Sequence, residues 1–141
     1  MLELFMGINK EITKDNADEL MKLYRRLLRM ADKEFTPKMT ATYSFEPKSY
    51  TGTNPDTIGD AVTRKIVAQQ ELNKIVEAIN KLNSYNRQLL YLKYMNKVEL
   101  SDVKIYTELA MSESTFYREL EKAQLELAEA YEGGELLSYY L

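Results

Sequence analysis

Apolar positions recur at intervals of three and four residues along residues 13–35, and this spacing predicts an amphipathic helix. The recurring positions are Leu20, Leu23, Tyr24, Leu27, Met30 and Ala31. Thr13 or Asp15 is the predicted N-cap, because a short polar side chain can accept a hydrogen bond from an unpaired amide at the helix start. A basic cluster lies on the same helix, at Lys22, Arg25, Arg26, Arg29 and Lys33. We interpret it as a solvated helix face, with contact to phosphate as the alternative.

The helical pattern stops over residues 36–60, where prolines and glycines lie among many Thr, Ser and Tyr residues. We therefore expect an irregular arm or linker in this part of the chain. Apolar spacing then predicts a second long helix, which begins at Thr57 or Asp60 and ends at Leu82. One more helix is predicted over residues 84–95, before a turn.

Two shorter helices are predicted between residues 101 and 131, with a turn near residues 110–112. Ser101 is a suitable N-cap for the first helix and Ser112 for the second. The second helix has one apolar face, formed by Phe116, Leu120, Ala123 and Leu127. Two helices joined by about three residues form a helix-turn-helix, which presents its second helix to the major groove of DNA. An ordinary helical hairpin is the alternative that spacing alone leaves open.

The composition of the chain argues against catalysis and against a metal site. Its 141 residues include no cysteine and no histidine, so thiolate ligands, disulfides and the usual neutral-pH proton carrier are all absent. Carboxylate groups such as Glu99 with Asp102 are common on helix surfaces. We expect no enzyme activity, no cofactor and no metal. The sequence shows no secretory leader and no segment of transmembrane length, which predicts a cytoplasmic protein without a membrane partner.

The net charge opposes DNA binding, since phosphate contacts usually need a surplus of Lys and Arg. It is -3 for the whole chain. Residues 84–141 hold six basic and ten acidic side chains, which leaves a net charge of -4 in the part that contains the predicted motif. Any contact with DNA must therefore be local.

Residues 78–95 and 103–127 together resemble the fourth conserved region of bacterial sigma factors. Matching positions in the two runs are Ala78, Leu82, Arg87, Leu90, Tyr94, Leu109, Met111, Ser112, Thr115, Phe116, Leu120 and Ala123. Three positions depart from that pattern. Tyr106 replaces a small residue, Ala110 replaces the turn glycine, and Glu119 stands where arginine is frequent. The resemblance implies a DNA-binding helix-turn-helix whose packing and phosphate contacts differ from those of sigma factors.

Most of the chain also resembles the ArpU family of phage and prophage transcriptional regulators. The likeness is carried by KLYRRLLRMADKEFTPKMTATYSFEPKSYTG and by KIYTELAMSESTFYREL with the later LAEAYEGGELL. This resemblance implies control of phage late functions, of packaging and lysis, or of autolysin genes. Two alternatives keep the same fold: an adaptor that binds RNA polymerase, and a terminase-type recognition protein in DNA packaging.

The motif assigns candidate DNA contacts to polar side chains at and near the start of the second helix. These residues are Lys104, Glu113, Ser114, Thr115, Tyr117, Arg118 and Lys122. Arg118 can donate two hydrogen bonds to guanine, whereas Lys104 and Lys122 are phosphate candidates. The alternative for each residue is an exposed polar position on a helix.

The sequence thus predicts an all-α protein, in which an irregular arm joins an N-terminal helix to a sigma-like helix-turn-helix. The expected division is an N-terminal helical segment (1–35), an arm (36–60), a DNA-binding domain (61–132) and a C-terminal tail (133–141). The tail could dock on the core or on a second subunit. Double-stranded DNA is the expected partner, and RNA polymerase and a second copy of the chain are further candidates.

Overall fold

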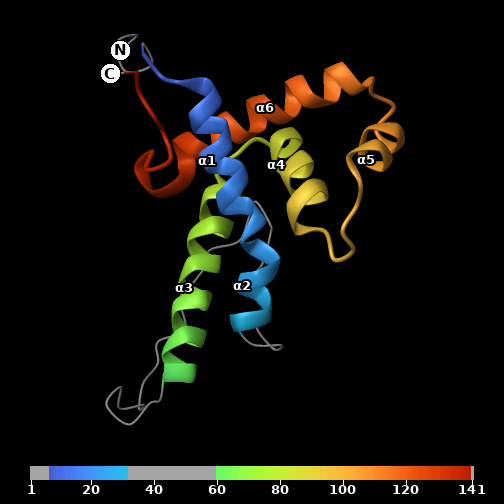
Figure 1. Ribbon diagram of the computed structural model, residues 1–141. Coiled ribbons are helices and arrows are strands. Elements are labelled where there is room, and N and C mark those ends of the chain that lie inside the picture. The colour runs from blue at the N-terminus through green and yellow to red at the C-terminus, as the bar shows by residue number, and fades with distance from the viewer. Residues whose placement is uncertain (1–6, 32–59, 141) are drawn as a thin grey trace.

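The computed structural model describes residues 7–31 and 60–140 (Figure 1). Within these two ranges the secondary structure is helical, which confirms the predicted all-α class. The elements are α1 (Lys10–Lys22), α2 (Tyr24–Ala31), α3 (Asp60–Asn80), α4 (Ser84–Leu90), a π-helical turn η3 (Tyr91–Met95), α5 (Asp102–Glu108), α6 (Glu113–Ala130) and a 3-10 turn η4 (Tyr131–Gly133). Strand pairing in the described ranges is limited to one antiparallel bridge between Ile8 and Tyr139.

The N-terminal segment forms two helices where the sequence predicts one. α1 ends at its C-cap Leu23, whose amide donates to the carbonyl of Leu20 at 3.1 Å and so tightens the last turn. α2 begins at the next residue. Leu23 lies at the break and is exposed, as is Met30, although the spacing places both on the apolar stripe. Residues 32–35 of the predicted helix lie outside the described residues.

The predicted caps of the first helix are wrong, because the helix begins earlier. Its N-cap is Asn9, whose side chain accepts a hydrogen bond from the amide of Ile12 at 3.1 Å. Thr13 and Asp15 lie inside α1. Thr13 is fully buried, and its hydroxyl oxygen accepts a hydrogen bond from the amide of Ser138 at 3.0 Å. A contact with the far end of the chain therefore occupies the side chain that the local pattern assigns to the cap.

The C-terminal tail docks on α1 of the same chain. Asn16 donates from its side-chain amide to the carbonyl of Leu136 at 3.0 Å, and the bridge between Ile8 and Tyr139 adds a second attachment. The sequence left two partners open for residues 133–141, namely the core and a second subunit. The structure shows the described part of this tail, 133–140, attached to α1 of the same chain. The beginning and the end of the described chain consequently lie together.

The second long helix, α3, spans Asp60–Asn80 and ends two residues before the predicted end at Leu82. Asp60 is the first described residue of this part of the chain, and the alternative start at Thr57 lies outside the described residues. The helix lies beside α2, as Figure 1 shows, and Gln69 donates to the last carbonyl of α2, that of Ala31, at 3.1 Å. The predicted arm is at residues 36–60, and all but its last residue lies outside the described residues.

One hydrophobic core joins the two described ranges. Its fully buried members come from every part of the fold and include Ala17, Met21, Leu72, Ile75, Leu89, Ile105, Phe116 and Leu127. α1 packs across the second half of α6, so the first half of α6 projects beyond it toward α5 (Figure 1). In the described part of the chain, no helix combines the length and the apolar character needed to cross a lipid bilayer.

Candidate nucleic-acid interface

Serine caps begin both helices of the predicted motif. The side-chain oxygen of Ser101 accepts from the amide of Lys104, and that of Ser112 accepts from the amide of Thr115, each at 3.2 Å. These bonds satisfy amides that have no partner within the first turn of a helix. Both predicted caps are confirmed, and they fix where α5 and α6 begin.

The turn between α5 and α6 closes on Ala110, within the predicted residues 110–112. Ala110 has a φ of 56°, in the left-handed region that favours glycine. Its amide donates to the carbonyl of Thr107 at 3.1 Å, and the amide of Met111 donates to that of Tyr106 at 2.9 Å. This pair of bonds is the Schellman arrangement that ends many helices. The chain therefore makes the turn without the glycine that sigma factors have there.

Ala110→Gly should stabilise the protein by about 1 kcal/mol, because a left-handed backbone strains an L residue but not glycine. Urea unfolding of the two proteins would measure the difference. Ala61→Gly is the matched control: Ala61 is an exposed residue of α3, where glycine should lower stability. A loss of stability in Ala110→Gly would contradict the strain argument.

Phe116 anchors α6 to the core. Its side chain is completely buried, and its ring lies 5.7 Å from that of Tyr106 on α5. Tyr106 on α5 therefore packs beside Phe116, the side chain that anchors α6. The other predicted apolar positions of α6, Leu120, Ala123 and Leu127, are buried as well.

The candidate contact residues lie mainly on the outer side of the motif. Glu113, Ser114, Tyr117, Arg118 and Lys122 on α6 are exposed, as is Lys104 on α5. Thr115 is half-buried, and its side-chain oxygen accepts a hydrogen bond from the Ser112 hydroxyl at 2.8 Å, so it supports the cap. Ser114, Tyr117 and Arg118 lie three and four residues apart, which places them on one face of the helix.

The sequence does not predict one contact of this face, the hydrogen bond between Tyr117 and Asp102. The Tyr117 hydroxyl donates to Asp102 Oδ2 at 3.0 Å, and Lys93 Nζ lies 2.9 Å from Asp102 Oδ1. The hydrogen bond to Asp102 raises the pKa of Tyr117 above its ordinary value. In the sequence, Asp102 stands out only as a carboxylate close to Glu99. No local signal connects it to a tyrosine fifteen residues later.

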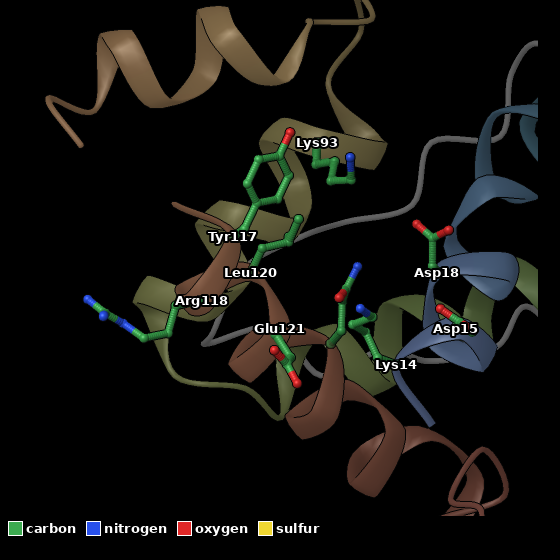
Figure 2. Close-up of a pocket in the computed structure, with 9 residues that line it drawn as sticks. Lys14, Asp15, Asp18, Lys93, Tyr117, Arg118, Leu120 and Glu121 are labelled. Atoms are coloured by element: carbon green, nitrogen blue, oxygen red, sulfur yellow. The ribbon is translucent and has the colours of Figure 1, made fainter. Parts of the chain in front are cut away.

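A cleft of about 510 Å³ separates the first half of α6 from α1 (Figure 2). Tyr117 points toward Lys93 at one side of it, Asp15 and Asp18 lie on the opposite wall, and Arg118 extends away from α1. The walls carry charges of both signs, and among the described residues no group of acidic side chains could hold a metal ion.

A polar chain that includes Asp18 and Gln124 of the cleft lining ties α1 to α6. Gln124 donates to the Tyr94 hydroxyl at 2.8 Å, and that hydroxyl donates to Asp18, which also pairs with Lys22 at 2.9 Å. Burial raises the pKa of Asp18, but the hydrogen bonds from Tyr94 and Lys22 outweigh it and the pKa lies below its usual value. These hydrogen bonds therefore favour the ionised form of the Asp18 side chain.

Several acidic side chains of the motif have partners within the protein. Glu126 accepts hydrogen bonds from the backbone amide of Asn83 at 3.2 Å and from the Asn86 side chain at 2.7 Å, which holds the start of α4 against α6. Glu119 pairs with Lys122 at 3.6 Å. Three carboxylates of the motif, those of Asp102, Glu119 and Glu126, are therefore held by partners within the protein.

The basic cluster of the N-terminal segment is not uniform. Lys22, although exposed, pairs with Asp18, and Arg25 donates to the carbonyl of Asn96 at 3.3 Å, so both side chains have partners in the same chain. Arg26 and Arg29 are exposed on α2, in agreement with a solvated helix face. Lys33 lies outside the described residues.

Comparison with known proteins gives two similar full-length relatives and one matching family. The chain is 28% identical to the "Putative autolysin regulatory protein ArpU" of Enterococcus hirae, over 98% of this chain and 99% of that protein. It is 27% identical to the protein of the same name from Streptococcus phage O1205, over 95% and 97%. No solved structure matches.

The matching family model is described as "Protein of unknown function (DUF1492)" and covers residues 53–128. That range contains α3, α4, η3 and α5, together with all of α6 except its last two residues. It includes both helices of the candidate interface. Because the match extends over more than half of the sequence, the chain belongs to the DUF1492 family.

Proposed function

We propose that this protein is a transcriptional regulator of phage or prophage genes that binds double-stranded DNA with the first half of α6. The observation that carries the proposal is the capped α6, which follows a tight turn and buries Phe116 while it exposes Ser114 and Arg118. A helix anchored in this way can enter the major groove with polar side chains on its outer face. The resemblance to sigma factors concerns the same two helices.

The names of the relatives support the regulatory part of the proposal. Both are called regulatory proteins, and one is encoded by a phage. The ArpU resemblance suggests that its targets are phage late genes, packaging and lysis genes, or autolysin genes. A regulator of such genes would act in the cytoplasm. The proposed role needs no catalysis and no cofactor, since a regulator acts through binding.

The contacts can be assigned by chemistry. Arg118 is the best candidate for a base, because its fork of donors matches guanine and because its side chain extends away from α1 (Figure 2). Ser114 lies in the first turn, where the helix dipole also favours phosphate. Glu113 lies in the same turn, and its carboxylate can accept a hydrogen bond from the amino group of cytosine. Lys104 and Lys122 are proposed phosphate contacts. Lys122 is 63% exposed, so its pairing with Glu119 is weak enough to exchange for DNA.

Arg118→Ala should weaken binding to the specific site by about 1 to 3 kcal/mol and relax the preference at one base pair. Footprinting on DNA from the protein's own genomic neighbourhood would first locate the site. Titrations at two salt concentrations would then compare the wild type, Arg118→Ala and the control Arg64→Ala, an exposed arginine on α3 that should change nothing. If Arg118 holds only phosphate, the loss should be equal on all sequences and the salt slope should fall by about one.

A footprint that survives the combined change Thr115→Ala, Tyr117→Ala and Arg118→Ala would exclude α6 as the DNA-contacting helix. A wild-type protein that gives no footprint, but binds purified RNA polymerase, would favour the adaptor alternative. Binding to a packaging site beside terminase genes would favour the recognition role in DNA packaging. Sedimentation of the free protein would show whether a second copy takes part.

A further inference from the structure

Tyr117 is exposed on the proposed DNA-binding face, yet its hydroxyl proton is already used. It donates to Asp102 Oδ2 at 3.0 Å, while Lys93 holds the other oxygen of that carboxylate at 2.9 Å. The Lys93 and Asp102 side chains are only 21% and 28% exposed. The acceptor is therefore fixed by a partly sheltered ion pair, and it does not turn freely in solvent.

The ring of Tyr117 is held at its base as well as at its hydroxyl. It lies edge to face with the buried ring of Phe116, with centroids 5.2 Å apart and planes at 68°. Nevertheless 44% of the residue is exposed. A side chain fixed at both ends, with its only donor occupied, offers an incoming ligand the carbon surface of its ring.

We propose that Tyr117 recognises the C5 methyl group of a thymine through this ring, and that Asp102 is the positioning residue that holds the ring in place. The inference rests on the proposed function of α6. In the major groove the thymine methyl is the apolar feature that distinguishes a base pair, and apolar side-chain surface is what recognises it. Tyr117 lies on the same helix face as Ser114 and Arg118, so one ring and two polar groups meet neighbouring bases.

The test uses the footprinted duplex with each thymine replaced in turn by deoxyuridine, which removes only the methyl group. For the wild-type protein, one replacement should lower affinity by about fourfold, the factor expected when one buried methyl group is lost. Tyr117→Ala should bind the thymine and deoxyuridine duplexes equally well. Tyr117→Phe keeps the ring, so it should retain part of the methyl effect.

The role of Asp102 is tested in the same titrations by a double-mutant cycle. Asp102→Ala and Tyr117→Phe should each lower affinity and shrink the methyl effect, and the double variant should lose no more than either single variant. A merely structural loss would not change the response to the methyl group. Lys104→Ala, a change of an exposed neighbour on α5, should weaken binding to thymine and deoxyuridine duplexes by the same factor.

Each result decides a separate claim. A specific site at which no thymine methyl affects binding, or one whose methyl effect persists in Tyr117→Ala, would overturn the thymine contact and leave the proposed function standing. Additive losses in the Asp102→Ala and Tyr117→Phe cycle would overturn the positioning role. The absence of any specific site for the wild-type protein would overturn the proposed function, and this inference with it.

Discussion

Phe116→Ala should lower the free energy of unfolding by about 3 to 5 kcal/mol, the range for removal of a buried aromatic ring. The side chain is completely buried and packs against the rings of Tyr106 and Tyr117. Its loss would leave a cavity between α5 and α6 that these larger neighbours cannot fill. Small domains are stable by about 5 to 15 kcal/mol, so the change should be plain in a urea titration.

Val103→Ala provides the control for this prediction. Val103 lies on α5, close in sequence to Tyr106, but it is 60% exposed, so its truncation should change stability by no more than about 0.5 kcal/mol. A loss below about 1 kcal/mol in Phe116→Ala would mean that the ring does not anchor α6. Burial of Phe116 would then not explain why the polar face of α6 is free for DNA.

Local signals predicted the two helices of the candidate interface. Ser101 and Ser112 act as caps through bonds to amides three residues later, and such short-range bonds depend little on the remainder of the fold. The apolar spacing from Phe116 to Leu127 likewise identified the buried face of α6. Even the turn at Ala110 could be placed, although the residue is not the usual glycine.

Long-range contacts account for what the sequence did not reveal. Thr13 looks like a helix cap, but the tail residue Ser138, 125 positions later, contacts its hydroxyl and α1 begins at Asn9 instead. The tether of Tyr117 to Asp102 crosses from one helix to another in the same way. Periodicity tells which face of a helix is polar. It does not tell which polar side chain on a neighbouring element will meet it.

Tyr94→Phe should lower the free energy of unfolding by about 2 to 4 kcal/mol, although it removes only one oxygen atom. The Tyr94 hydroxyl donates to the carboxylate of Asp18 and accepts from Gln124, both inside the fold. Hydrogen bonds to a charged group contribute about 1.5 to 3 kcal/mol, and the stranded donor of the buried Gln124 side chain adds a desolvation cost. Urea unfolding at neutral pH measures the loss, and Tyr140→Phe, at a residue 67% exposed, should leave stability unchanged.

The stability lost in Tyr94→Phe should also depend on pH, which gives a second test of the prediction. Burial and the hydrogen bond to Asp18 raise the pKa of Tyr94, so its contribution to stability is complete below its ordinary pKa of 10.0 and disappears as the pH rises above that value. The pKa of Asp18 is lowered, so the carboxylate contributes above its ordinary pKa of 3.8 and the contribution disappears as the pH falls. The difference between wild type and Tyr94→Phe should therefore be largest and nearly constant from about pH 5 to pH 9, and shrink on both sides. Tyr131, whose pKa burial and Glu71 raise to about 12, remains in both proteins and cancels from the comparison. A difference that grew above pH 10 would contradict a neutral Tyr94 hydroxyl as the link between α1 and α6.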